Sequence, residues 1–285
     1  MTRLTPLACS LIFAAACGAL FLAAKPAQQV SPAQPTQQTP PTQDDTATVH
    51  PGDALHAPFD TLLSNFVKDG WVDYAGLKEE GRDELRVYLG QLGQTDPASL
   101  DRPATLAFWL NAYNAFTLQL ILEHHGKIES IKDISSSKRW DAERWTVHGE
   151  NYSLDQIEHE ILRPMGDARV HFGLVCASKS CPDLLSEAFL PSTLEAQLDA
   201  AARGFLADTF KGANVVTEDG WFGKDYNLYL SKIFSWFDDD FERGDTHVVD
   251  FVLPYLPDAA AKYVREHRDD IDVEYFDYDW SLNGV

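Results

Sequence analysis

Two cysteines five residues apart lie in the segment of this chain with the most chemical potential. Cys176 and Cys181 fall within the sequence HFGLVCASKSCPD at positions 171–183. The composition of residues 169–175 predicts a buried strand that ends near Cys176, and Pro182 favours a helix that begins beside Cys181. Unpaired N–H groups at a helix start stabilise a thiolate. Either cysteine is a candidate nucleophile, and the expected helix favours Cys181.

The same two cysteines also fit other roles. They can close the loop with a structural disulfide or form a reversible redox pair in an oxidising compartment. Zinc is not expected, because the C-x4-C spacing has no second ligand pair nearby. The sequence also contains no Gly-rich phosphate loop, HExxH or GxSxG pattern. We therefore expect neither a metal nor a cofactor.

Two histidines and a glutamate could activate a thiol. Ser153 and Gln156 form a capping-box pattern that predicts a helix to about residue 163, with Glu158 beside its buried stripe and His159 on another face. Glu158 would orient a base or make a structural contact. His159 or His171 would be the general base of a Cys–His pair, and His171 could instead be a core histidine.

Two buried amides are candidates for contacting a substrate. Asn111 and Asn114 lie three residues apart in an apolar segment that predicts a central helix over 103–124. A buried amide needs hydrogen-bond partners, so each either ties the helix to a neighbour or points into a cleft. In a cleft, an asparagine can polarise a reacting carbonyl.

The remaining patterns predict an α+β fold, with a helical subdomain packed on a mostly antiparallel sheet. Helical spacing also occurs at 59–67 and 85–92, and a hairpin is expected at 145–152. Short strands are expected near Val215, Leu228 and 273–276, and helices at 232–241 and 248–253. The acidic end of the 232–241 helix, at 238–240, is expected to be solvated.

The N-terminus predicts export. Residues 1–24 contain an apolar run typical of a signal peptide or an N-terminal membrane anchor, and Cys17 lies in a sequence that loosely resembles a lipoprotein cleavage site. Residues 25–54 are rich in Pro, Gln and Thr and predict a disordered linker. The globular part is expected at 55–285. The predicted location is the bacterial cell envelope, in the periplasm or anchored to the membrane and facing out of the cytoplasm.

The charge of the chain excludes some partners. A formal net charge of −21 repels nucleic acid and anionic lipid surfaces. Contact with a membrane is therefore expected through the N-terminal segment only. A small molecule or a peptide remains as the expected substrate, and no pattern in the sequence fixes an oligomeric state.

Six motifs in order resemble the DUF547 family, a domain of unknown function, over about residues 57–283. They are GWVDY (70–74), AFWLNAYNAF (107–116), YSLDQIEHEILR (152–163), RVHFGLVCASKSCP (169–182), LSKIFSWF (230–237) and YDWSLN (278–283).

The resemblance implies a relation to the papain- and transglutaminase-like superfold, whose members use a cysteine, a histidine and a carboxylate or amide. In addition to the residues named above, the family's motifs highlight Ser178, which we group with Asn111 and Asn114 as a candidate for contacting the substrate. We expect a cysteine-dependent hydrolase or acyltransferase acting on a peptide-like or thiol-containing substrate. The alternative is a non-catalytic binding domain with a structural Cys176–Cys181 disulfide.

Overall fold

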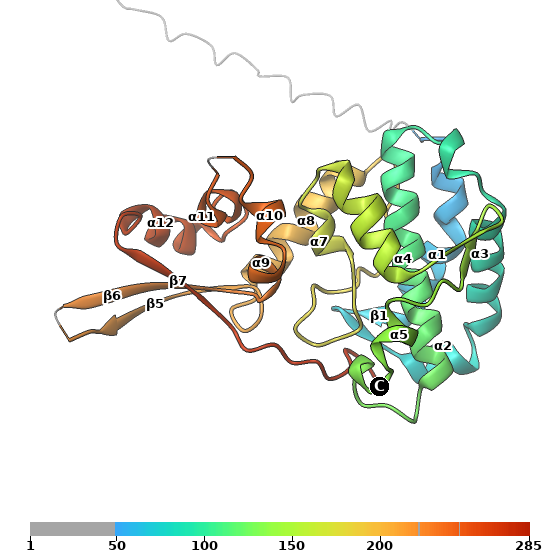
Figure 1. The fold of residues 1–285 in the computed structure, drawn as a ribbon, viewed down its shortest axis with the longest axis horizontal. Helices are drawn as coiled ribbons and strands as arrows, with labels where there is room; N and C mark the ends of the chain where they lie inside the picture. Colours follow the sequence, from blue (N-terminus) through green and yellow to red (C-terminus); the bar gives the residue numbers. More distant parts are fainter. Residues whose placement is uncertain (1–48, 222, 245) are drawn as a thin grey trace, which may run out of the picture. The chain divides into compact units, whose positions relative to one another are not determined.

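A long apolar helix, α4 (Arg102–His124), runs through the larger hydrophobic core of the protein in a computed structural model (Figure 1). The structure describes residues 49–221, 223–244 and 246–285. Asp101 caps α4 by accepting a hydrogen bond from the Ala104 amide at 3.0 Å, and Pro103 lies in the first turn, where no N–H is needed. Every residue from 106 to 118 is buried, which confirms the predicted central helix.

Three helices and a short hairpin pack around α4. The helices α1 (Asp53–Phe66), α2 (Tyr74–Glu79) and α3 (Arg82–Gln94) contact α4 and one another, in the blue and green part of the ribbon (Figure 1). The antiparallel strands β1 (Val67–Lys68) and β2 (Trp71–Val72) connect α1 to α2.

A second hydrophobic core lies between a three-stranded sheet and the helices near it. The strands are β5 (Ala213–Asp219), β6 (Lys224–Leu230) and β7 (Ile271–Tyr275). β5 pairs antiparallel with β6, and β6 pairs parallel with β7, so Leu228 lies opposite both Val215 and Val273. The helices of this core are α8 (Leu194–Ala207), α9 (Ile233–Trp236), α10 (Asp238–Phe241), α11 (Val248–Val252) and α12 (Asp258–Glu266).

Between α4 and α8 the chain forms a series of short elements. They are η2 (Ile131–Asp133), α5 (Ser136–Arg139), the antiparallel hairpin of β3 (Trp145–Val147) and β4 (Glu150–Tyr152), α6 (Leu154–Gln156), the π-helical η3 (Ile157–Leu162), η4 (Arg163–Met165) and α7 (Val170–Gly173). A further turn, η1 (Pro97–Ser99), precedes α4. The predicted capping box is present, because Ser153 and Gln156 exchange side-chain-to-backbone hydrogen bonds of 3.0 and 2.9 Å.

The C-terminal segment (residues 276–285) returns from the sheet to the first core (Figure 1). The amide of Leu282 donates to Glu129 O at 2.9 Å, and the amide of Asn283 donates to Ala177 O at 3.2 Å. Val72 and Val285 are also hydrogen-bonded through their backbones. This segment therefore holds together β2, the turn before η2 and the loop that follows Cys176.

The α+β class and the small antiparallel pairings are confirmed, whereas a papain- or transglutaminase-like core is not. Two predictions beside the cysteines are wrong. Residues 169–175 contain the helix α7 rather than a strand, because a short apolar run fits a buried helix equally well. No helix begins at Pro182, since residues 182–190 form an irregular loop. The expected helix at 232–241 is divided into α9 and α10 at Phe237.

The predictions for residues 1–24, and for nearly all of 25–54, lie outside the described residues. The helix α1 begins at Asp53, two residues inside the predicted linker. Within the described ranges, none of the helices combines the length and the apolar character needed to span a bilayer.

The close packing of the C-terminal segment predicts a stability change. A Cβ added at Gly284 would lie 2.1 Å from Val72 O, so Gly284→Ala should lower the free energy of unfolding by about 1–3 kcal/mol. The control is Gly90→Ala in α3, where an added Cβ meets nothing within 4 Å and helix propensity should raise stability by about 0.5–1 kcal/mol. Urea denaturation measures both, and an equal effect of the two variants would contradict this packing.

Candidate active site

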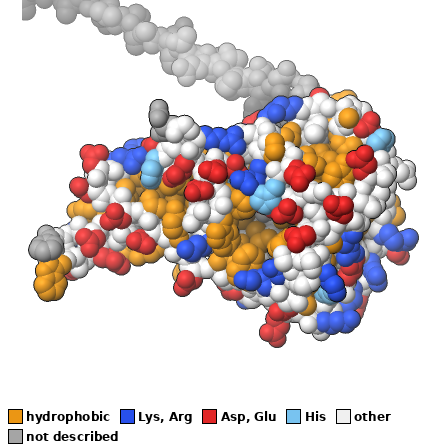
Figure 2. Space-filling model, viewed as in Figure 1, with side chains coloured by type: hydrophobic (Ala, Val, Ile, Leu, Met, Phe, Trp, Pro, Cys, Tyr) orange, Lys and Arg blue, Asp and Glu red, His pale blue; other side chains and the backbone are white. Residues whose placement is uncertain are grey.

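A cleft of about 200 Å³ brings together five residues that the sequence singled out: Glu158, His159, His171, Cys176 and Cys181. The other residues that line it are Tyr113, Trp140, Asp155, Leu174, Pro182, Ile233, Trp236, Phe237, Tyr278 and Trp280. Figure 2 shows hydrophobic side chains gathered in a hollow on one face of the molecule. The cleft is therefore mainly aromatic, with two thiols, two imidazoles and two carboxyl groups in its wall.

Cys176 is the thiol that its surroundings ionise. Its sulfur lies 3.0 Å from Ser178 Oγ and 3.4 Å from the hydroxyl oxygen of Tyr278. A hydrogen bond from the Cys181 side chain, together with those from Ser178 and Tyr278, outweighs the effect of burial and lowers the pKa of Cys176 to about 6. These donors favour the thiolate form of Cys176, and the helix start that favoured Cys181 is not present.

Cys181 has a different environment. Its side chain is buried, and burial raises the pKa of this thiol above its usual range. Both cysteines are free thiols in the structure, so the disulfide considered as an alternative is not formed here. The Cys176 amide donates to Cys181 Sγ at 3.1 Å. Cys181 thus supports the loop and the charge on its neighbour, and it lacks the helix start that would have activated it.

The backbone around Cys176 is fixed from both sides. Asn114 donates to Gly173 O at 2.8 Å and accepts from the Val175 amide at 3.0 Å, which positions the chain just before Cys176. Ala177 has φ of 59°, a left-handed conformation that costs a residue with a side chain about 1–3 kcal/mol. The Asn283 amide holds the Ala177 carbonyl. The sharp turn that presents Cys176 is therefore maintained by long-range contacts.

The residues expected to contact substrate have structural positions instead. Asn111 exchanges two hydrogen bonds with the backbone of Phe189, at 2.7 and 2.9 Å, and Asn114 is occupied as described above. Neither amide lines the cleft, so the structure does not support a polarising role for them. Ser178 is buried behind the Cys176 sulfur, where its Oγ also lies 3.2 Å from the Tyr278 hydroxyl oxygen.

Glu158 faces the cleft from the π-helical segment η3. The Tyr113 hydroxyl donates to its Oε2 at 3.2 Å. Burial raises the pKa of Glu158 to about 7; the Tyr113 hydrogen bond opposes this, and the charge on Cys176 adds to it. A carboxyl with this pKa can both donate and accept a proton near neutral pH.

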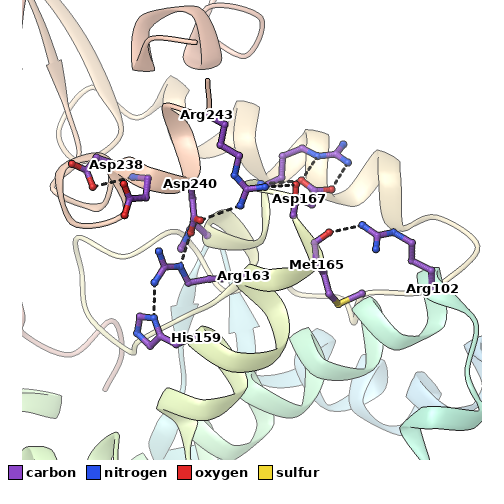
Figure 3. Close-up of polar contacts among 12 residues, drawn as sticks. Arg102, His159, Arg163, Met165, Asp167, Asp238, Asp240 and Arg243 are labelled. Atoms are coloured by element: carbon purple, nitrogen blue, oxygen red, sulfur yellow. Dashed lines mark hydrogen bonds and ion pairs between the residues drawn. The ribbon is translucent and has the colours of Figure 1, made fainter. Parts of the chain in front are cut away.

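A shared ionic network holds the two histidines, and Figure 3 shows the part that links His159 through Arg163 to Asp240. Arg163 donates to His159 Nδ1 at 2.7 Å and pairs with Asp240 at 2.6 Å. The buried His171 donates from Nε2 to Asp240 at 2.8 Å and stacks on Phe237. Burial would raise the pKa of Asp240, but hydrogen bonds from Arg163, His171 and Arg243 lower it to about 2.

This network constrains what each imidazole can do. Burial lowers the pKa of His171 to about 4, despite the neighbouring carboxylate of Asp240. His159 is more exposed, and its Nε2 lies 3.6 Å from Asp155 Oδ1. In the described part of the chain, neither cysteine sulfur makes a hydrogen bond to an imidazole. The geometry thus favours a thiolate that is stabilised by hydroxyl and thiol donors.

Sequence reasoning missed several residues of this site. Tyr278 and Trp280 occur in the YDWSLN motif, which was used for the family resemblance alone. Trp236 lies within the helix expected at 232–241 and is 45% exposed at the cleft. Asp240 was assigned to a solvated end, yet its side chain is 9% exposed and holds His171. The spacing of Trp236 and Asp240 offers no signal, because the helix is interrupted at Phe237 between them.

Comparison with protein families agrees with the sequence motifs. Residues 97–206 match the family described as "Protein of unknown function, DUF547". The chain contains a DUF547 domain. Searches of curated proteins and of solved structures gave no match. The matched range includes every candidate residue named from the sequence, whereas Trp236, Asp240 and Tyr278 follow it in the chain.

The environment of Cys176 predicts how the DUF547 domain reacts with iodoacetamide. Because the thiolate is the reactive form, Cys176 should be alkylated in the native protein with a pH midpoint near 6. Tyr278→Phe removes a donor and should move this midpoint toward the usual value near 9, whereas Tyr229→Phe on β6 should not. Peptide mapping by mass spectrometry at a series of pH values measures the rate at Cys176. A wild-type midpoint near 9 would be incompatible with the structure.

His171 predicts a loss of stability in acid. Its folded pKa of about 4 is below the unfolded value of 6.5, so the unfolded chain binds more protons between these values. The free energy of unfolding should therefore decrease as the pH falls from 6.5 to 4, by at most about 1.4 kcal/mol per pH unit.

Replacing His171 tests whether its imidazole causes this pH dependence of stability. The loss of stability between pH 7 and pH 5, measured by denaturation, should be smaller in His171→Gln than in the wild type by about 1–2 kcal/mol. His148→Gln, at an exposed turn outside this network, is the control and should leave the difference unchanged. The same pH dependence in all three proteins would contradict the assigned pKa of His171.

Proposed function

We propose that this protein is a cysteine-dependent hydrolase or acyltransferase acting on a peptide-like or thiol-containing substrate. The observation that carries the proposal is the ionised Cys176 in an aromatic cleft, beside Glu158 with a pKa of about 7. A thiolate is a strong nucleophile toward acyl carbons, and a carboxyl titrating near neutral pH can move the protons that acyl transfer requires.

Cys176 and Glu158 act in this scheme as one coupled pair. Burial and the charge of Cys176 raise the pKa of Glu158, so near neutral pH part of the molecules hold a proton on the carboxyl group while the sulfur is negative. Attack by the sulfur on the substrate carbonyl forms the S–C bond. As the C–N or C–S bond to the leaving group breaks, Glu158 donates its proton to that group, and an acyl-thioester remains on Cys176.

The second half of the reaction restores the starting state. The Glu158 carboxylate accepts a proton from water, or from an acceptor thiol or amine, as this nucleophile attacks the thioester. The S–C bond then breaks, the acyl group leaves with the nucleophile, and Cys176 is again a thiolate. His159 lies at the more exposed side of the cleft, where Arg163 fixes its ring. Its Nε2 can orient the water, thiol or amine that attacks the thioester.

The N-terminal sequence carries a second part of the proposal. The apolar run in residues 1–24, followed by a polar linker, supports an exported protein whose catalytic domain is released or tethered at the outer side of a bacterial membrane. In such a compartment the buried position of Cys181 limits its oxidation and keeps Cys176 available.

An activated ester tests the catalytic proposal. With p-nitrophenyl acetate, the wild-type chain should give a burst of nitrophenol and, after acid quenching, an acetyl group on Cys176 detected by peptide mass. Cys176→Ala should lose the burst and about 100-fold or more of the turnover, and Glu158→Gln should slow turnover by at least about 100-fold. Cys181→Ala should retain the acetyl adduct.

Two outcomes would reject this function. One is unchanged turnover in Cys176→Ala. The other is a purified wild-type protein that contains a complete Cys176–Cys181 disulfide and forms no adduct, which would support the non-catalytic binding domain instead.

A further inference from the structure

The charged groups in the cleft wall have one sign. Asp155 and Glu158 contribute carboxyl groups from one turn of the α6–η3 helix, so both lie on the same side of it. Among the described residues, no Lys or Arg side chain lines this cleft. An anionic group entering the cleft would meet the Asp155 carboxylate and the Cys176 thiolate, because the nearby cations Lys132 and Arg163 contact the lining rings Trp280 and Phe237 and do not themselves line the cleft.

A group of aromatic rings extends from the thiolate to the surface. The Tyr278 hydroxyl contacts the Cys176 sulfur, and the Tyr278 ring lies 4.6 Å from Trp280 and 4.7 Å from Trp236. Trp236 and Trp280 stack at 5.6 Å. Aromatic faces carry negative electrostatic potential, and several faces near a carboxylate form the usual binding site of an alkylammonium group.

The protein itself shows that these rings accept a cation. The Lys132 ammonium lies 4.8 Å from the centre of the Trp280 ring. Within the described residues, no Lys or Arg occupies the corresponding position over Trp236, which is 45% exposed. A ligand can therefore reach the Trp236 face from solvent.

From this arrangement we propose that the cleft selects substrates with an alkylammonium group close to the reacting carbonyl, such as a lysine-like or other diamino-acid side chain. The inference rests on the proposed function, because it identifies the substrate class of the same site. An uncharged aromatic group on the substrate would stack on these rings but would form no ion pair with Asp155. An ammonium group can contact the aromatic faces and also pair with the Asp155 carboxylate. The net charge of −21 attracts such a cation from solution.

The experiment uses three iodoacetamides that share one reactive group and differ in their tails. The tails end in trimethylammonium, in the neutral isostere tert-butyl, and in sulfonate. Rates of thioether formation at Cys176 in the full-length protein are measured at pH 8 by peptide mapping. The rate for each reagent is divided by the rate at which the same reagent alkylates free glutathione. Glutathione corrects for the intrinsic reactivity of each reagent.

The trimethylammonium reagent should react at least about tenfold faster than the tert-butyl reagent after this correction, and the sulfonate reagent should be slowest. Asp155→Asn and Trp236→Leu should each reduce the preference severalfold. Glu160→Gln and Trp221→Leu are matched controls, because both side chains are exposed and neither lines the cleft. These controls should preserve the preference.

The outcomes separate this inference from the proposed function. Rapid alkylation with equal corrected rates for the three reagents, or a preference for sulfonate, would overturn the ammonium specificity while leaving the nucleophile intact. A preference that survives both Asp155→Asn and Trp236→Leu would also overturn it. Failure of all three reagents to modify native Cys176 would instead reject the reactive thiolate on which the proposed function depends.

Discussion

Keeping a sulfur ionised in a largely apolar cleft requires hydrogen-bond donors in fixed positions, and much of this structure serves that requirement. Burial alone would protonate Cys176, as it does Cys181. The difference between the two thiols comes from Ser178, Tyr278 and the neighbouring thiol, which all direct donors at the Cys176 sulfur. Each of these groups must be held in place by the rest of the fold.

The positions of those donors depend on contacts between segments far apart in the chain. Tyr278 belongs to the C-terminal segment, which reaches the cleft because its last residues pair with Val72 and with the loop at Ala177. Asn114 in the central helix fixes the backbone before Cys176. Asp240 fixes the histidine side of the cleft in a similar way, because its carboxylate pairs with both Arg163 and His171. The site is therefore formed jointly by α4, by the segment between α4 and α8, and by elements near the C-terminus.

This dependence explains what could be predicted from the sequence. Local patterns identified α4, the β3–β4 hairpin and the capped helix with Glu158, because periodicity and capping act over a few residues. They also located five residues of the cleft. They wrongly predicted a strand at 169–175 and a helix beginning at Pro182, because tertiary contacts determine the structure of both segments. Asp240 was misread for a related reason: three acidic residues in a row suggest solvent, and only the fold shows which of them meets two arginines and a buried histidine.

The same reasoning accounts for the presence of two cysteines where one nucleophile is enough. A second thiolate beside Cys176 would repel the first, so Cys181 must keep its proton, and burial at 4% exposure ensures that it does. A protonated thiol is also a donor: the Cys181 side chain contributes most to the low pKa of Cys176, and its Sγ also lies 3.6 Å from Leu174 O. An alanine at position 181 would remove this donor, and a serine would replace it with a stronger one. The pair is thus best understood as a thiolate and the thiol beside it, with different protonation states produced by a difference in burial and in hydrogen bonding.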